Sequence, residues 1–380
     1  MSQTFHLGQY WSSRHREIRL FLSTDARLDG GRNRGTARDV TLSAADLLGA
    51  RRQFRRLHEG TAWNAVRFSY RALATPVVEL IERLDADGQE VDDWASRALA
   101  AASGDVLSIE ALDCAPAIDA DHLVAPVIPR RAQAFGVTYL NSALERETEG
   151  TRGDYGYVYR SVKERGERPE LFLKGTASEH FVGPNGLMGL RHDLTNSVDR
   201  TGNAVERTQV LSGIEPELAA VVRSDGRIWG YTLADDVSGN RIENESLLYL
   251  YQAKHFTGGL VLGPLILLSR EQENPRVDIT ARIRDPQGRV LFEKSTNSSR
   301  INAPLGCLVA WARSHLLLQP AELFSTGTDM VPDGAVKVLS PGMTVEIASP
   351  AIGILRHGAG MVREGALLNA DYDRWEFEGV

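Results

Sequence analysis

The chain has 380 residues, 42% hydrophobic and 24% charged, which is ordinary for a soluble globular protein of one or two domains. Its net charge of −7 argues against nucleic-acid binding, because phosphate recognition requires a basic surface. Two cysteines exclude a disulfide framework and a cysteine zinc site, and they favour a reducing cytoplasm. The chain shows no secretory signal, and its longest apolar run, residues 260–268, is too short to span a membrane.

The first part of the chain, residues 1–125, is predicted to form a supporting domain of short strands and helices. Apolar residues at helical spacing, with a capping box, predict a helix over residues 43–57. Two further helices are predicted, over residues 76–84 with proline in the first turn and over residues 94–102. A proline-rich linker then leads into a second, catalytic domain, predicted over residues 126–380.

The second domain is predicted to be rich in strands. A strand over residues 133–140 precedes a charged segment, residues 141–169, for which two interpretations remain open. Charged connections usually face solvent, but a mobile lid over a site has the same composition. A strand over residues 170–174 ends at a lysine. The later elements are predicted as a hairpin, a helix and a strand, over residues 277–294, 303–318 and 343–347.

The stretch of residues 214–236 carries the strongest local signal. An Asp-Gly pair at residues 225–226 lies between two apolar runs, which predicts a two-residue type I′ hairpin turn. In that register Glu215 faces Asp236, and Glu217 lies on the same face because side chains alternate along a strand. Carboxylates placed together need a counterion, and an all-oxygen set suits Mg²⁺, Mn²⁺ or Ca²⁺. A solvated acidic edge is the alternative interpretation.

Five short blocks follow one another in a specific order between residues 133 and 357. They are Gly136-Val137-Thr138-Tyr139, Glu170-Leu171-Phe172-Leu173-Lys174 with Val182-Gly183-Pro184, Glu215-Pro216-Glu217, Gly230-Tyr231-Thr232 through Asp236-Val237-Ser238, and Thr326-Gly327-Thr328. Together they resemble the fumarylacetoacetate hydrolase superfamily. A further run, Glu243-Asn244-Glu245 with Leu248-Tyr249-Leu250 and Gln252-Ala253-Lys254, most resembles its branch of 2-keto-3-deoxy-sugar-acid dehydratases.

The resemblance implies an α+β fold in which a mixed β-roll domain follows a smaller N-terminal α+β domain. It implies a homodimer or higher homo-oligomer, with Mg²⁺ held by Glu215, Glu217 and Asp236. It also implies that Lys254 points at a metal-bound 2-keto acid substrate and that Thr328 lies near the carboxylate end of that substrate.

Two departures from the family pattern bear on the reaction. Hydrolase members carry a histidine at the lid position that matches Ser142, with a glutamate partner at Glu145. This chain keeps the glutamate and lacks the histidine, so elimination is favoured over hydrolysis. The usual substrate arginine is replaced by Asn240; Arg241 can substitute from one residue on, or the substrate differs. Lys174 is kept as a substrate contact, with a surface lysine at a strand end as an equal alternative.

The expected reaction is metal-assisted β-elimination of water from a 2-keto-3-deoxy-pentonate, giving 2-oxoglutarate semialdehyde in pentose and sugar-acid catabolism. Lys254 is expected to remove the proton from carbon 3, while Glu145 assists loss of the hydroxyl from carbon 4. Two alternatives remain. One is hydrolysis or decarboxylation of a β-diketo or oxo-dicarboxylic acid at the same site, and the other is a non-catalytic family member.

Overall fold

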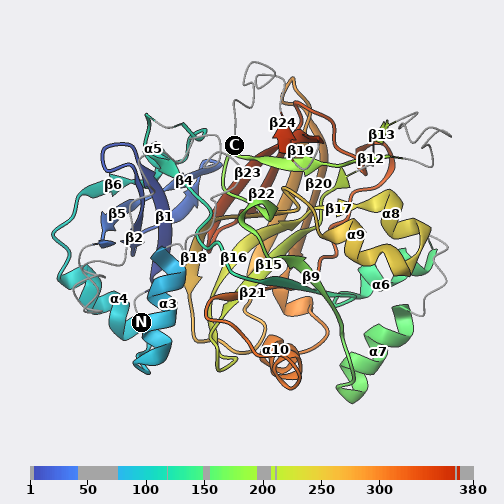
Figure 1. Ribbon diagram of the computed structural model, residues 1–380, viewed down its shortest axis with the longest axis horizontal. Helices are drawn as coiled ribbons and strands as arrows, with labels where there is room; N and C mark the ends of the chain where they lie inside the picture. The colour runs from blue at the N-terminus through green and yellow to red at the C-terminus, as the bar shows by residue number, and fades with distance from the viewer. Residues whose placement is uncertain are drawn as a thin grey trace, which may run out of the picture.

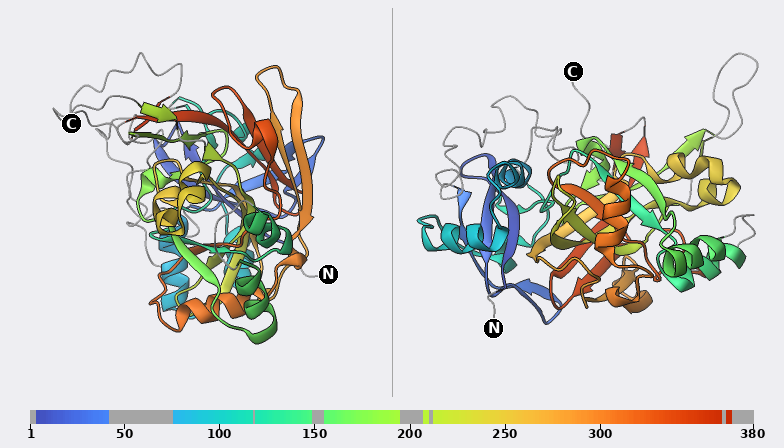
Figure 2. Two further views of the ribbon diagram at one scale, coloured as in Figure 1. Left: turned by 90° about the vertical axis from the view of Figure 1, so that its right-hand side faces the viewer. Right: turned by 90° about the horizontal axis from the view of Figure 1, so that it is seen from below.

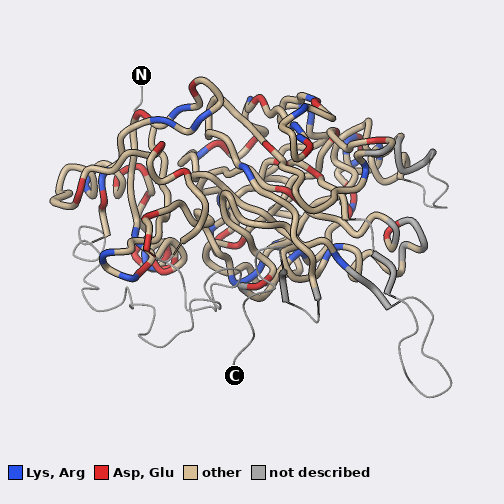
Figure 3. The backbone as a smooth tube through the Cα atoms, turned by 90° about the horizontal axis from the view of Figure 1, so that it is seen from above, with Lys and Arg blue, Asp and Glu red and all other residues tan. Residues whose placement is uncertain are grey.

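The structure is a computed structural model, and it describes residues 4–41, 76–117, 119–148, 155–194, 207–209, 212–363 and 366–368. Two mixed sheets form its centre, and helices lie at both ends (Figures 1 and 2). Helices α3 and α4 cover the end built from the N-terminal strands, and α6 to α9 lie at the opposite end. Acidic and basic residues are interspersed along the chain (Figure 3).

The larger sheet has 12 strands within the described ranges, in the order β6-β5-β2-β1-β18-β16-β15-β21-β8-β9, with β10 beside β18 and β7 beside β1. They are β1 (His6–Ser12), β2 (Glu17–Ser23), β5 (Thr36–Asp39), β6 (Val106–Ser108), β7 (His122–Leu123), β8 (Ala132–Gly136), β9 (Glu170–Gly175), β10 (Phe181–Val182), β15 (Pro216–Val222), β16 (Ile228–Asp236), β18 (Leu260–Leu268) and β21 (Glu322–Ser325). Because β1 pairs with β18, this sheet continues across residue 125. The division into two domains there stays a prediction.

The smaller sheet follows the order β11-β23-β22-β19-β20, with β24 beside β23. Its strands are β11 (Leu187–Leu190), β19 (Asp278–Arg284), β20 (Val290–Asn297), β22 (Thr344–Ser349), β23 (Gly353–Arg363) and β24 (Ala366–Leu368). Three strand pairs complete the described part: β3 (Arg27–Asp29) with β4 (Arg32–Arg34), β12 (His192–Leu194) with β13 (Arg207–Gln209), and β14 (Ser212–Gly213) with β17 (Ser238–Gly239). The predicted late hairpin is β19–β20, and the predicted late strand is β22.

The α-helices assigned in the described residues are α3 (Pro76–Ala86), α4 (Val91–Ala100), α5 (Ile109–Leu112), α6 (Leu140–Thr148), α7 (Tyr155–Arg165), α8 (Asn240–Glu245), α9 (Leu250–Lys254) and α10 (Leu305–Arg313). Short 3₁₀ turns are η1 (Ser178–His180), η2 (Leu247–Tyr249), η3 (Ser298–Arg300) and η4 (Gly334–Val336). The helices predicted over residues 76–84 and 94–102 are α3 and α4, whereas residues 43–57 lie outside the described ranges. Within those ranges, the structure contains no helix long and apolar enough to cross a membrane.

Two predicted boundaries in the second domain are wrong. The strand predicted over residues 133–140 ends at Gly136, and α6 already begins at Leu140. The helix predicted over residues 303–318 ends at Arg313. The charged segment after β8 folds as α6 and α7, with residues 149–154 outside the described ranges. The apolar pattern continues past the end of each element because Tyr139 and Leu318 pack on the core from loops.

Alternation along β15 sends its side chains into two separate cores. Ala219 and Val221 pack with α3 and α4 on one face of the large sheet. Leu218 and Ala220 pack on the other face, with residues of the smaller sheet such as Ile347. The large sheet is therefore buried on both faces in the region of β15 and β16, and a polar side chain there needs a polar partner.

Candidate metal centre

The hairpin of β15 and β16 keeps the predicted register although its predicted turn is wrong. Arg223 and Arg227 flank a three-residue turn in which Gly226 has a φ of +88°, as a left-handed residue in such a loop requires. The pairing is displaced by one residue at the bulge beside Val221. Beyond the bulge, Pro216 lies opposite Asp235, as predicted.

Three carboxylates meet at the open end of this hairpin. One carboxylate oxygen from each of Glu215, Glu217 and Asp236 lies within 4.8 Å of the other two. Glu217 and Asp236 are 2% and 0% exposed, and Glu215 is partly buried. The backbone N–H of Asp236 donates to the carbonyl of Glu215 at 3.0 Å. The structure thus brings the three predicted ligands together, in a buried set of oxygen donors that fits Mg²⁺, Mn²⁺ or Ca²⁺.

Two fully buried lysines face this cluster. The Nζ of Lys174 lies 2.6 Å from Oδ1 of Asp236 and donates to the carbonyl of Val237 at 2.6 Å. The Nζ of Lys254 lies 2.7 Å from Oε1 of Glu215 and 3.6 Å from Oδ2 of Asp236. Lys254 therefore lies beside the carboxylates, and its contact with a bound substrate stays a prediction. Lys174 is a buried partner of Asp236, and its alternative interpretation as a surface residue is wrong.

Burial sets the direction of the pKa shifts in the cluster. Burial raises the pKa of Glu217 well above its usual range, and the charges of Asp236 and Glu215 raise it further. Burial also raises the pKa of Asp236, against the opposing effect of Lys174 and Lys254. The pKa of Lys174 is lowered by burial. Grouped carboxylates of this kind retain protons in the absence of a cation, and a divalent ion would displace those protons.

The loop after β21 holds the second oxygen of Glu217. The N–H of Gly327 donates to Oε2 of Glu217 at 2.9 Å. Gly327 has a φ of +82°, and a Cβ at this position would lie 2.2 Å from Oγ1 of Thr138. Thr138 in turn donates to the carbonyl of Thr326 at 2.5 Å. Glycine is thus required for the close approach that fixes Glu217.

The other candidate residues lie in the loop after β21 and in helices α6 and α8. Thr328 is buried, and its Oγ1 accepts a hydrogen bond from the N–H of Met330 at 3.1 Å. Asn240 begins α8 and donates to the carbonyl of Lys337 at 3.1 Å, so its amide nitrogen contacts backbone. Ser142 is partly buried in α6. Glu145 and Arg241 lie in α6 and α8, but their side chains lie outside the part of the chain that the structure describes.

Two residues next to Lys254 were not among the predicted site residues. Ser238 accepts a hydrogen bond from Lys254 at 2.5 Å and donates to Oε1 of Glu215 at 2.9 Å. Glu243 is 8% exposed, and its Oε1 lies 3.8 Å from the Nζ of Lys254. The alternation that relates Ser238 to Asp236 could have indicated the serine. Glu243 depends on where α8 begins, which no local pattern specifies.

Comparisons with known proteins give one family match and two similar sequences. Residues 195–358 match the family described as fumarylacetoacetate (FAA) hydrolase C-terminal. The probable 2-keto-3-deoxyxylonate dehydratase of Haloferax volcanii is 32% identical over 277 residues, which cover 71% of this chain and 88% of that protein. The 2-dehydro-3-deoxy-D-arabinonate dehydratase of Saccharolobus solfataricus is 32% identical over 240 residues, which cover 61% of this chain and 72% of that protein.

Solved structures show the same fold. The 2-keto-3-deoxy-D-arabinonate dehydratase complexed with magnesium and 2,5-dioxopentanoate aligns with a TM-score of 0.63 and 23% identity, covering 94% of this chain and 100% of that chain. Its apo form aligns with a TM-score of 0.62 and 24% identity over the same shares of both chains. This likeness confirms the predicted strand-rich α+β fold with mixed sheets.

Proposed function

The chain belongs to the fumarylacetoacetate hydrolase family, and from this premise we propose that it is a Mg²⁺-dependent dehydratase of a 2-keto-3-deoxy-pentonate. Both curated relatives are named as dehydratases of such acids. The observation in this chain that supports the proposal most strongly is the buried Lys254, whose Nζ lies 2.7 Å from a carboxylate of the candidate metal centre. A lysine in this position can accept a proton from a substrate that is bound at the metal site.

Glu215, Glu217 and Asp236 would hold the metal ion, with Mn²⁺ or Ca²⁺ as possible substitutes for Mg²⁺. When bound, the ion supplies Lewis acidity, which acidifies the proton on carbon 3 of a 2-keto acid. Gly327 fixes the carboxylate of Glu217 through its N–H, and Lys174 fixes that of Asp236. The hairpin and its neighbours therefore orient the donor set before the ion arrives.

Lys254 takes the proton from carbon 3 in the proposed reaction. Ser238 orients its Nζ, and the ring of Phe172, 5.4 Å from that nitrogen, shields it from water. Glu145 in α6 gives a proton to the hydroxyl that leaves carbon 4, so that one water is lost and a double bond forms between carbons 3 and 4. Proton transfer from carbon 5 to carbon 3, followed by tautomerisation, gives 2-oxoglutarate semialdehyde.

The residues that contact the substrate are also proposals. Thr328 is assigned to the carboxylate end of the substrate, because it lies one residue beyond the glycine that holds Glu217. Lys174 supplies positive charge beside Asp236, and its side chain is held over the ring of Phe256 at 5.4 Å. Ser142, Asn240 and Arg241 complete the proposed set, from the first turns of α6 and α8.

We also propose that the protein acts in the cytoplasm, in pentose and sugar-acid catabolism, as a homodimer or higher homo-oligomer. Its two cysteines suit a reducing compartment. Leu248 in η2 and Tyr251 in α9 are 88% and 53% exposed, and exposed apolar groups of this size support a protein interface. Sedimentation equilibrium of the purified protein tests the assembly, and a monomer at micromolar concentration would contradict it.

The reaction is tested by NMR in D₂O with the chelator-treated protein and both carbon-4 stereoisomers of a 2-keto-3-deoxy-pentonate. We expect Mg²⁺-dependent exchange of the carbon-3 protons, with formation of the semialdehyde from one isomer. Exchange without the semialdehyde would point to a different substrate, such as one that is cleaved. Absence of both exchange and product, with Mg²⁺ shown to be bound, would refute the dehydratase proposal for these acids.

A further inference from the structure

A second buried aspartate lies next to the candidate metal ligand on β16. Side chains alternate along the strand, so Asp235 and Asp236 point to opposite faces of the sheet. Asp235 shares its face with Leu233, which packs with the smaller sheet. Its Oδ2 lies 2.9 Å from Nε2 of His357 in β23, and both side chains are 0% exposed. A buried polar contact therefore joins the two sheets behind the carboxylate cluster.

The other oxygen of Asp235 holds the backbone of a candidate metal ligand. The N–H of Glu215 donates to Oδ1 of Asp235 at 2.8 Å. Glu215 lies in the short break between β14 and β15, and the following residue, Pro216, has no N–H to donate. The carbonyl of Glu215 accepts from Asp236 at 3.0 Å. The peptide groups on both sides of the Glu215 side chain are thus fixed by the Asp-Asp pair of β16.

Removal of His357 would change this arrangement without touching any carboxylate of the centre. A buried aspartate that loses its partner is costly, and it turns toward other donors or admits water. Oδ1 would then no longer be fixed opposite the N–H of Glu215. Metal donors must stay within about 0.5 Å of their productive positions, and outer partners of metal ligands typically change affinity about 10-fold to 100-fold.

We propose that His357 is a positioning residue of the metal centre: it fixes Asp235, which fixes the backbone of Glu215 and hence the carboxylate that meets a divalent ion. The smaller sheet thereby sets the geometry of a site that is built on the larger one. This inference rests on the proposed function, because it takes Glu215 to be a metal ligand.

The test compares His357→Gln with His357→Met in the full chain, with Mg²⁺ affinity measured by calorimetry on chelator-treated protein. The two side chains have nearly the same length, but only glutamine offers an N–H to Asp235. We expect about 10-fold to 100-fold weaker binding for His357→Met and at most about threefold weaker binding for His357→Gln. Equal affinities in the two variants would overturn the proposal, since the role of His357 would then be packing alone.

Val345→Ala is the matched control, because Val345 is buried in β22 directly opposite His357. It should lower the melting temperature and leave the Mg²⁺ affinity unchanged; an equal loss of affinity would also overturn the proposal. Where the His357 variants do not fold, Asp235→Asn and Asp235→Leu ask the same question, since only asparagine keeps an acceptor for Glu215. Equal Mg²⁺ affinity in these two variants counts against the positioning role. If the wild-type protein binds no Mg²⁺, both the positioning role of His357 and the proposed function are refuted.

Discussion

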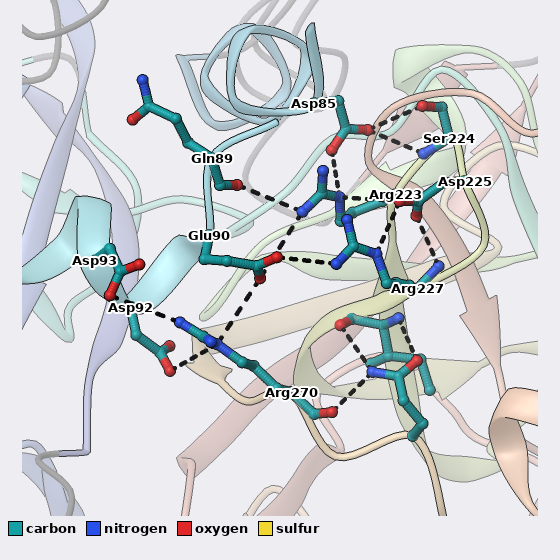
Figure 4. Close-up of polar contacts among 12 residues, drawn as sticks. Asp85, Gln89, Glu90, Asp92, Asp93, Arg223, Ser224, Asp225, Arg227 and Arg270 are labelled. Atoms are coloured by element: carbon teal, nitrogen blue, oxygen red, sulfur yellow. Dashed lines mark hydrogen bonds and ion pairs between the residues drawn. The ribbon is translucent and has the colours of Figure 1, made fainter. Parts of the chain in front are cut away.

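The two ends of the β15–β16 hairpin arrange their charges in opposite ways. At the turn, Arg223 contacts Asp85 in α3 at 2.7 Å, with both side chains nearly buried. Arg227 lies 2.8 Å from Asp225 and 2.9 Å from Glu90, so cations and carboxylates alternate there (Figure 4). This end docks the hairpin onto the segment that joins α3 to α4.

At the open end, carboxylates outnumber cations. Lys174 and Lys254 face Glu215, Glu217 and Asp236, of which Glu217 on β15 and Asp236 on β16 are buried. Such a surplus of like charge costs folding free energy, because burial strengthens the repulsion. The matched charges at the turn end therefore indicate docking between two parts of the chain. The unmatched buried charges at the open end indicate a site that is completed by a ligand.

The largest effect is expected from Lys254→Met, which removes the proposed proton acceptor and keeps the length of the side chain. We expect kcat to fall by about 100-fold to 10,000-fold, while Mg²⁺ still binds. Steady-state kinetics and calorimetry measure the two quantities. Lys294→Met, in β20 of the smaller sheet, is the control and should keep full activity. A loss of less than tenfold in Lys254→Met would exclude this role.

Arg223→Met tests the turn end of the hairpin. It leaves Asp85 buried without its cation, and breaking a buried pair costs about 3–5 kcal/mol of the free energy of unfolding. We expect kcat to be unchanged at temperatures where the variant is folded, as urea unfolding and kinetics on the same sample will show. In the double variant with Asp85→Asn much of this loss should be regained. A fall in kcat without a loss of stability would mean that the two ends are not separate in function.

Glu217→Gln tests the open end of the hairpin, where we expect a gain of stability instead of a loss. The pKa of Glu217 is raised in the folded state above its usual value of 4.5. The stability that its carboxyl group contributes is therefore present below pH 4.5 and is lost as the pH rises. Without metal, we expect the variant to be more stable than the wild type at pH 8, and the difference to shrink toward pH 4.5. Urea unfolding at several pH values measures it. A metal-free variant that is less stable at pH 8 would show that the cluster is not strained.

The smallest effect is expected from Arg270→Gln at the rim of the turn end. Arg270 lies 3.1 Å from Asp92, and its side chain is 49% exposed. Exposed ion pairs contribute about 0–1 kcal/mol, and salt screens them. We expect a loss of stability within that range in dilute buffer and none at about 1 M salt. A loss that persists in salt would indicate a packing role for the arginine stem.

Alternation along the strands, together with the hairpin register, was enough to predict the carboxylate cluster. Side chains of a strand change face at every residue, so Glu215 and Glu217 had to share a face once the strand was identified. The predicted turn was one residue too short, but the bulge beside Val221 absorbs the extra residue. The register at Pro216 and Asp235 was therefore right, although the turn was wrong.

Contacts between distant parts of the chain could not be predicted from local pattern. Gly327, which holds Glu217, is 110 residues away in the sequence, and Asp85 is 139 residues from Ser224 in the turn that it contacts. The position of Lys254 beside the cluster followed from the resemblance to a family, because no periodicity relates a short helix to a neighbouring hairpin. Glu243 was missed for the same reason.

The most direct test of the contrast between the two ends is the melting temperature of wild-type protein and Glu217→Gln, measured at pH 8 over a range of Mg²⁺ concentrations. We expect the variant to melt higher without Mg²⁺ and the wild type to melt higher at saturating Mg²⁺, because only the complete carboxylate set gains stability by binding. The two curves should therefore cross. Parallel curves, or a wild type that does not respond to Mg²⁺, would contradict the assignment of the open end as a metal centre.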